Sequence, residues 1–114
     1  MQDDCLFCKI ANKTIPSDIV FEDEKVIAFK DINPQAPVHI LIIPSVHYDS
    51  VLNIAAGNDI LSHIHTVAIR LAIKFDIAQK GFRLVNNCGT DGGQTVGHLH
   101  YHLLGGRALS WPPG

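Results

Sequence analysis

Three histidines near the C-terminus alternate with apolar residues, and this spacing carries the clearest chemical signal in the chain. His98, His100 and His102 fall within residues 96–104, which we expect to form a β-strand. Because side chains alternate across a strand, the imidazoles should project to one face and the apolar residues between them to the other. An imidazole can act as a nucleophile, a proton donor or a metal ligand. The row therefore allows three interpretations: hydrogen-bonded polar residues, a metal site, or nucleophilic catalysis.

The loop that precedes these histidines favours nucleophilic catalysis. Residues 90–95 read Thr-Asp-Gly-Gly-Gln-Thr and supply backbone N–H groups, an amide and a hydroxyl. Such a loop can hold a phosphate, although two adjacent glycines alone usually mark only a turn. A neutral imidazole beside it can attack phosphorus, form a phosphoramidate and yield it to water, which divides one difficult displacement into two steps. The pattern predicts an enzyme that acts at the phosphorus of a nucleotide.

Hydrophobic periodicity predicts an α+β fold in one domain, residues 1–114. The long helix is expected over residues 58–80, with Asn58 as its N-cap and Gly81 just past its end. Ile69, Ile73 and Ile77 widen its apolar surface beyond one stripe, which suggests a homodimer. The remaining elements are a short helix over residues 5–12 and five strands, over residues 19–21, 26–30, 38–43, 82–86 and 96–104.

Composition excludes several classes of protein. The 114 residues are 46% hydrophobic and 18% charged, which fits one compact core. A net charge of -2 with scattered basic residues argues against a nucleic-acid-binding protein. The longest apolar run, residues 40–43, is too short to cross a membrane, and residues 1–4 show no leader pattern. We therefore expect a cytoplasmic protein that binds neither nucleic acid nor membrane.

The sequence resembles the histidine triad (HIT) superfamily. Its motif alternates histidine with apolar residues and is matched by His98-Leu99-His100-Tyr101-His102-Leu103-Leu104. The similarity extends over residues 7–10, 28–37, 39–44 and 105–114, and the Trp-Pro-Pro-Gly ending points to the Hint branch. The resemblance implies a five-stranded antiparallel sheet, continued across a homodimer through the long helix and a strand.

The same resemblance implies a purine nucleoside phosphoramidase. Such an enzyme cleaves the P–N bond of adenosine or guanosine 5'-phosphoramidates, acts likewise on aminoacyl adenylates, and releases a nucleoside monophosphate. A dinucleoside polyphosphate hydrolase is the alternative within the superfamily, and the C-terminal ending argues against it. A third alternative is a nucleotide-binding or zinc-stapled interaction protein without catalysis.

Individual site residues follow from motif positions in the resemblance. His100 would be the nucleophile, with His102 and His39 contacting the phosphate, and Asp31 would bind the ribose hydroxyls. Thr95 would protonate the leaving amine. The remaining nucleotide contacts implied are the apolar base slot of Leu6, Phe7, Ile10, Phe29 and Ile32, together with Asn87, Gly93 and Gln94. For each apolar residue taken alone, sequence spacing does not distinguish a base slot from the core, and a place in the core is the more frequent role.

Cys5 and Cys8 have the two-residue spacing that lets both thiolates reach one metal ion. Spacing alone also allows two unligated thiols at the start of a helix. The family resemblance implies a structural zinc, completed by His47 and His98, that would clamp the N-terminal helix to the sheet. The third cysteine, Cys88, has no part in this site.

Overall fold

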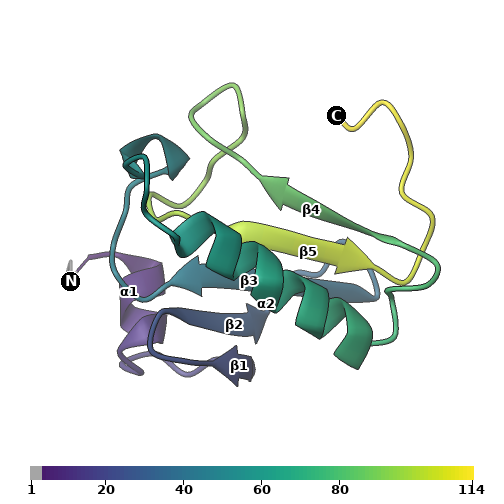
Figure 1. Ribbon diagram of the computed structural model, residues 1–114, viewed down its shortest axis with the longest axis horizontal. Helices are drawn as coiled ribbons and strands as arrows, with labels where there is room; N and C mark the ends of the chain where they lie inside the picture. The colour runs from purple at the N-terminus through teal and green to yellow at the C-terminus, as the bar shows by residue number, and fades with distance from the viewer. Residues whose placement is uncertain (1–3) are drawn as a thin grey trace.

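The computed structural model describes residues 4–114 as one antiparallel sheet with a long helix across it (Figure 1). The strands lie in the order β1-β2-β3-β5-β4, so the predicted α+β fold with a five-stranded antiparallel sheet is confirmed. The helices are α1 (Leu6–Ala11), a 3-10 turn η1 (Val51–Asn53) and α2 (Ile60–Lys74). The strands are β1 (Ile19–Glu22), β2 (Val26–Lys30), β3 (Val38–Pro44), β4 (Phe82–Asn86) and β5 (Tyr101–Gly105).

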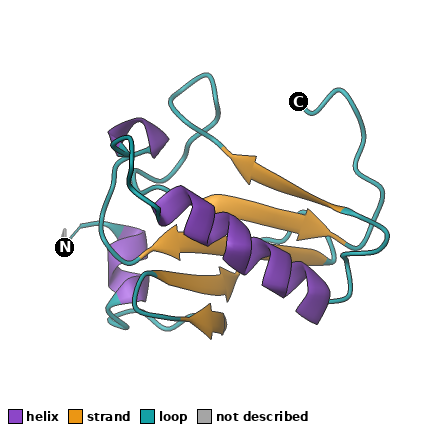
Figure 2. Ribbon diagram, in the orientation of Figure 1, coloured by secondary structure: helices purple, strands orange, loops and turns teal. Residues whose placement is uncertain are grey.

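Strands β2 and β3 are apolar apart from Lys30 and His39, because both faces of the sheet are covered. In β2, Val26 and Ala28 pack in the cluster that contains α2, whereas Ile27 and Phe29 pack in the cluster that contains α1. Strand β3 is buried at every position after Val38. Helix α2 lies across one face, and the short α1 covers one end of the other (Figure 2). The sheet therefore separates two apolar layers, and the layer on the α1 side is the smaller.

Helix α2 is shorter than the sequence predicts. It begins at Ile60, where the Asn58 side chain accepts a hydrogen bond from the Ile60 N–H at 2.9 Å, and it ends at Lys74. The helix cannot continue because Asp76 takes a left-handed conformation with φ of 60°. Ile77 then turns into the core and is 4% exposed, so its predicted place on an outer helical face is wrong. Ile69 and Ile73 do lie exposed on α2.

The last strand also differs from the prediction. Strand β5 begins at Tyr101, and residues 96–100 approach it without a strand ladder, so His98 and His100 do not lie on a strand. One reason is the end of the neighbouring strand: the Pro44 carbonyl accepts a hydrogen bond from the His98 ring, and proline has no N–H to donate. The side chains of residues 98–101 still alternate between the two faces of the sheet, as predicted. Leu99 and Tyr101 pack on the α2 side, whereas the rings of His98 and His100 contact Phe7 of α1.

Among residues 4–114 we find no helix long and apolar enough to cross a membrane. Residues 1–3, part of the N-terminal stretch expected to carry no leader pattern, lie outside the described part of the chain.

Candidate active site

A cavity of about 280 Å³ opens on the α1 side of the sheet. It combines an apolar wall from α1, β2 and β3 with a polar edge from the loop after β2 and from the histidine segment. Most of the predicted site residues therefore lie in one place. The cavity is lined by Leu6, Phe7, Ile10, Ile15, Pro16, Ser17, Phe29, Lys30, Asp31, Ile32, Leu41, Thr95, Val96, His100 and His102.

The Nδ1 atom of His100 makes a hydrogen bond within the protein, and its Nε2 atom is left to react at the cavity. Its Nδ1 lies 2.7 Å from the His98 carbonyl oxygen, which can only accept, so Nδ1 carries the proton. Burial lowers the pKa of His100 despite this hydrogen bond, and the ring is neutral at pH 7. The Phe7 ring packs edge-on against it at 5.0 Å between centroids. His100 thus presents an unprotonated Nε2 in a fixed orientation, which is what a nucleophile requires.

His39 and His102 form a second pair with defined proton positions. The Gln35 N–H donates to His39 Nδ1 at 3.0 Å, so the proton of neutral His39 sits on Nε2. That Nε2 lies 2.9 Å from His102 Nδ1 and 3.4 Å from Asp31 Oδ2. Burial lowers the pKa of His39. Burial also lowers the pKa of His102, to about 4, and repulsion from the neighbouring His100 and His39 adds to this effect. His102 consequently accepts at Nδ1 and carries its proton on Nε2, as a donor at the cavity wall.

Four residues predicted to contact the nucleotide do not line this cavity: His39, whose ring reaches it only through His102, and three loop residues, Gln94, Asn87 and Gly93. Gln94 braces two loops: its Nε2 donates to the carbonyls of Asp49 and Val96 at 2.7 and 3.0 Å, and its Oε1 accepts from the Gly89 N–H at 3.1 Å. Asn87 is half-buried and Gly93 is exposed in the same loop. A contact of these three residues with a nucleotide stays a prediction.

Sequence reasoning missed Asn86, the neighbour of the expected Asn87. Asn86 ends β4 opposite Tyr101, and its Nδ2 donates to the His100 carbonyl at 3.0 Å. This bond fixes the backbone that carries the predicted nucleophile. Only the register between β4 and β5 reveals the contact, because the two residues are 14 positions apart.

A second cluster places the four predicted metal ligands together. The donor atoms of Cys5, Cys8, His47 and His98 all lie within 4.8 Å of one another. The His98 Nδ1 is 3.3 Å from Cys5 Sγ and 3.5 Å from Cys8 Sγ, and the His47 Nδ1 is 3.3 Å from Cys8 Sγ. Tetrahedral zinc with ordinary bond lengths separates sulfur from nitrogen by about 3.5 Å, so the spacing fits.

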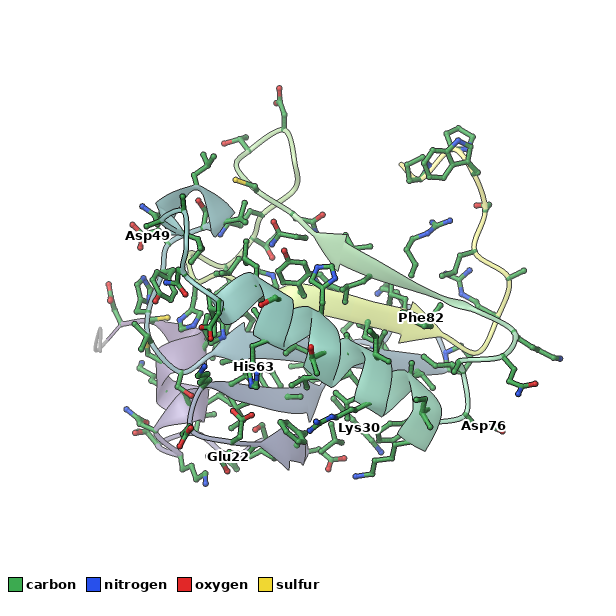
Figure 3. The ribbon with its side chains drawn as sticks, in the orientation of Figure 1. Glu22, Lys30, Asp49, His63, Asp76 and Phe82 are labelled. Carbon is green, nitrogen blue, oxygen red and sulfur yellow. The ribbon has the colours of Figure 1, made fainter. Side chains whose placement is uncertain are left out.

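The partners of the two rings support the same conclusion. His98 Nε2 donates to the Pro44 carbonyl at 2.9 Å, and His47 Nε2 donates to Asp49 Oδ1 at 2.7 Å. Asp49 lies beside the 3-10 turn, at the end of the sheet that α1 covers (Figure 3). With both Nε2 atoms protonated, both Nδ1 lone pairs face the thiols, as metal-binding histidines require. The residues present fit a Cys2His2 zinc site.

Comparison with known proteins assigns the family. The sequence matches the HIT domain family over residues 12–109. The chain belongs to the HIT domain family.

Relatives of this HIT protein span nearly its full length. It is 47% identical to the purine nucleoside phosphoramidase of Escherichia coli strain K12, over 96% of the chain and 92% of the relative. It is 50% identical to a 14 kDa zinc-binding protein of Zea mays, over 96% and 87%. A histidine triad protein from Clostridium difficile has a solved structure that is 54% identical with a TM-score of 0.94, over 96% of both chains. These similarities confirm the predicted resemblance and support the Hint branch.

The low pKa of His102 predicts that the HIT protein loses stability in mild acid. An unfolded histidine has a pKa near 6.5. Between pH 6.5 and about pH 4, His102 is therefore protonated in the unfolded chain and neutral in the folded protein. Stability should fall as the pH drops through this window, and at pH 5 His102 contributes about 1 kcal/mol of the loss after discounting for solvent exposure. Urea unfolding at pH 7 and pH 5 measures the total loss. The loss should shrink in His102→Gln, and an equal loss in both proteins would contradict the assignment to His102.

Proposed function

We propose that the protein is a nucleotide hydrolase of the phosphoramidase type. It cleaves the P–N bond of purine nucleoside 5'-phosphoramidates, and likewise aminoacyl adenylates, to a nucleoside monophosphate. The observation that carries the proposal is the fixed tautomer of His100, whose Nδ1 is engaged by the His98 carbonyl while Nε2 stays available at the cavity. Similarity to a purine nucleoside phosphoramidase supports the choice of substrate.

The reaction proceeds in two displacements at phosphorus. His100 Nε2 attacks, a new P–Nε2 bond forms, and the P–N bond to the amine breaks. The departing amine takes a proton, which we assign to the Thr95 hydroxyl at the edge of the cavity. Water then attacks the nucleotidyl-histidine, one water proton returns to the Thr95 oxygen, and breaking of the P–Nε2 bond restores neutral His100. The sum is phosphoramidate plus water giving amine plus nucleoside monophosphate.

Other cavity residues bind and orient the nucleotide. His102 donates from Nε2 to a phosphate oxygen, and His39 supports it from behind. Asp31, held by the Asn33 N–H at 2.8 Å, accepts from the ribose hydroxyls. The Gly93 backbone and the side chains of Asn87 and Gln94 complete the phosphate side in this proposal. The base lies in the apolar slot of Leu6, Phe7, Ile10, Phe29 and Ile32.

The proposal includes a structural zinc at Cys5, Cys8, His47 and His98. The donor geometry and the name of the maize zinc-binding relative support it. A zinc ion there supplies a cross-link between α1 and the loops before η1 and β5, and no step of the reaction uses it. Thiolate ligands persist in a reducing compartment, which agrees with a cytoplasmic location.

A homodimer is also part of the proposal. Strand β4 lies at one edge of the sheet and could continue into a second copy, and Ile69 and Ile73 of α2 are 54% and 66% exposed. Two neighbouring apolar side chains on a helix face are stabilised by burial against a partner. Pairing through α2 and β4 would extend the sheet across both chains.

Turnover of two substrate classes tests the proposed function. We expect steady release of amine from a fluorogenic adenosine 5'-phosphoramidate, with kcat/KM at least about 10²-fold above that for a dinucleoside polyphosphate. The reverse preference would favour the dinucleoside polyphosphate hydrolase. Binding of AMP without turnover of either substrate would favour a nucleotide-binding protein.

A further inference from the structure

The tail after β5 contacts the loop that holds the pair His39 and His102. The resemblance covers Gly105-Gly106-Arg107, yet the reaction above gives these residues no role. Gly106 has φ of 92°, and a Cβ on it would lie 2.9 Å from Pro37 Cβ. The glycine therefore lets the tail pass directly over the loop that joins β2 to β3.

The Arg107 guanidinium group forms hydrogen bonds to that loop. Its Nε and Nη2 both donate to the Gln35 carbonyl, at 3.1 and 2.9 Å, and its Nη1 donates to the Ala108 carbonyl at 2.9 Å. Two donors on one oxygen define direction as well as distance, because the guanidinium group is planar and rigid. A lysine ammonium at this position would supply a point contact without that direction.

Gln35, which accepts these hydrogen bonds, is also the residue that orients His39. Gln35 donates its N–H to His39 Nδ1 at 3.0 Å while its carbonyl accepts from Arg107. Pro34 and Pro37 of the same loop carry no N–H. A continuous chain of hydrogen bonds thus runs from Arg107 through Gln35 and His39 to His102.

We propose that Arg107 is a positioning residue for the reaction. By holding Gln35, it keeps the Gln35 N–H on His39 Nδ1, which places the His39 proton on Nε2 and points it at His102. His102 then accepts at Nδ1 and presents its own Nε2–H to the phosphate. The inference rests on the proposed function for its kinetic consequence, whereas the tautomer of His39 is a property of the protein alone.

Arg83 provides a matched control. It is also an arginine that donates to main-chain carbonyls in the C-terminal tail, to Leu109 at 3.4 Å and Ser110 at 3.0 Å, and its Cζ lies 5.8 Å from the centroid of the Trp111 ring. No described contact links it to the Gln35 loop. Loss of Arg83 therefore removes a tail tether and one positive charge while leaving the chain to His102 intact.

The experiment combines kinetics with imidazole NMR on Arg107→Gln, Arg107→Lys and Arg83→Gln. We expect Arg107→Gln to lower kcat for an adenosine phosphoramidate about tenfold with little change in KM, and Arg107→Lys to lie between it and the parent. Long-range 1H–15N spectra should show His39 as a single Nε2-protonated tautomer in the parent and in Arg83→Gln. The same spectra should show a tautomer mixture in Arg107→Gln.

Two outcomes would overturn the inference. One is an unchanged His39 spectrum in both Arg107 variants. The other is an equal loss of kcat in Arg83→Gln. If Arg107→Gln fails to fold, Arg107→Lys keeps the charge and carries the test. A parent protein without turnover would contradict the proposed function, and the spectra would still decide whether Arg107 sets the tautomer.

Discussion

Replacement of His100 by alanine is expected to lower kcat for phosphoramidate hydrolysis by about 10⁴-fold or more. The His100 ring supplies the Nε2 lone pair that attacks phosphorus, and the hydrogen bond from its Nδ1 to the His98 carbonyl keeps that lone pair at the cavity. Without it, water must displace the amine directly, with no covalent intermediate. Nucleotide affinity should change little, because the apolar slot and Asp31 remain. Steady-state kinetics and calorimetric titration with AMP measure the two effects separately.

Chemical rescue provides the control for this substitution. In His100→Gly the space of the missing ring is open, so added imidazole should enter it and restore part of the turnover. His102→Ala should reduce kcat less than His100→Ala, since it removes a hydrogen-bond donor to the phosphate and leaves the nucleophile. Activity of His100→Ala within tenfold of the parent would contradict covalent catalysis by this residue.

Loss of one thiolate from the Cys2His2 cluster is expected to have the largest effect on stability. Cys5 is the N-cap of α1, and its Sγ accepts from the Cys8 N–H at 3.3 Å. Serine also caps helices well, so Cys5→Ser keeps the cap and removes a soft ligand. Zinc content should fall from about one ion per chain to near zero. The free energy of unfolding should fall by about 3–5 kcal/mol, which lowers Tm by about 10–20 °C.

Cys88→Ser is the matched control for the zinc experiment. Cys88 is half-buried in the loop after β4 and is not among the four clustered ligands. Its replacement should leave zinc content and Tm close to those of the parent. Metal analysis of protein purified without chelator or added zinc decides the premise: a parent that holds almost no zinc would remove the proposed site. A parent with zinc and an unchanged Tm in Cys5→Ser would make the ion irrelevant to stability.

The sequence predicted most of the fold because burial patterns are local. Strands β2 and β3 appear as apolar runs broken only by Lys30 and His39, and Asn58 marks the start of α2 within two residues. The end of α2 was not predictable, because it depends on a left-handed Asp76 that allows Ile77 to enter the core. The start of β5 was also missed, since the ladder begins only at Tyr101, opposite Asn86 at the end of β4.

The residues of the candidate site were predictable from the sequence. Which ring nitrogen of each histidine carries the proton was not. Family resemblance grouped Cys5 with His98, and the structure brings the two together across 93 positions. No sequence pattern could assign the tautomer of His100 or of His39. Each tautomer depends on the direction of a main-chain group a few residues away, the His98 carbonyl in one case and the Gln35 N–H in the other, and the local backbone conformation sets that direction.

Reliance on main-chain groups has an evolutionary consequence. The Pro44 carbonyl, the His98 carbonyl and the Gln35 N–H orient three rings, and every amino acid except proline carries all the atoms needed at position 35. Drift of the Gln35 side chain therefore leaves its backbone donor in place. Selection can change the loop around the pocket, and with it the molecules that the pocket admits, without disturbing the proton arrangement of the histidines.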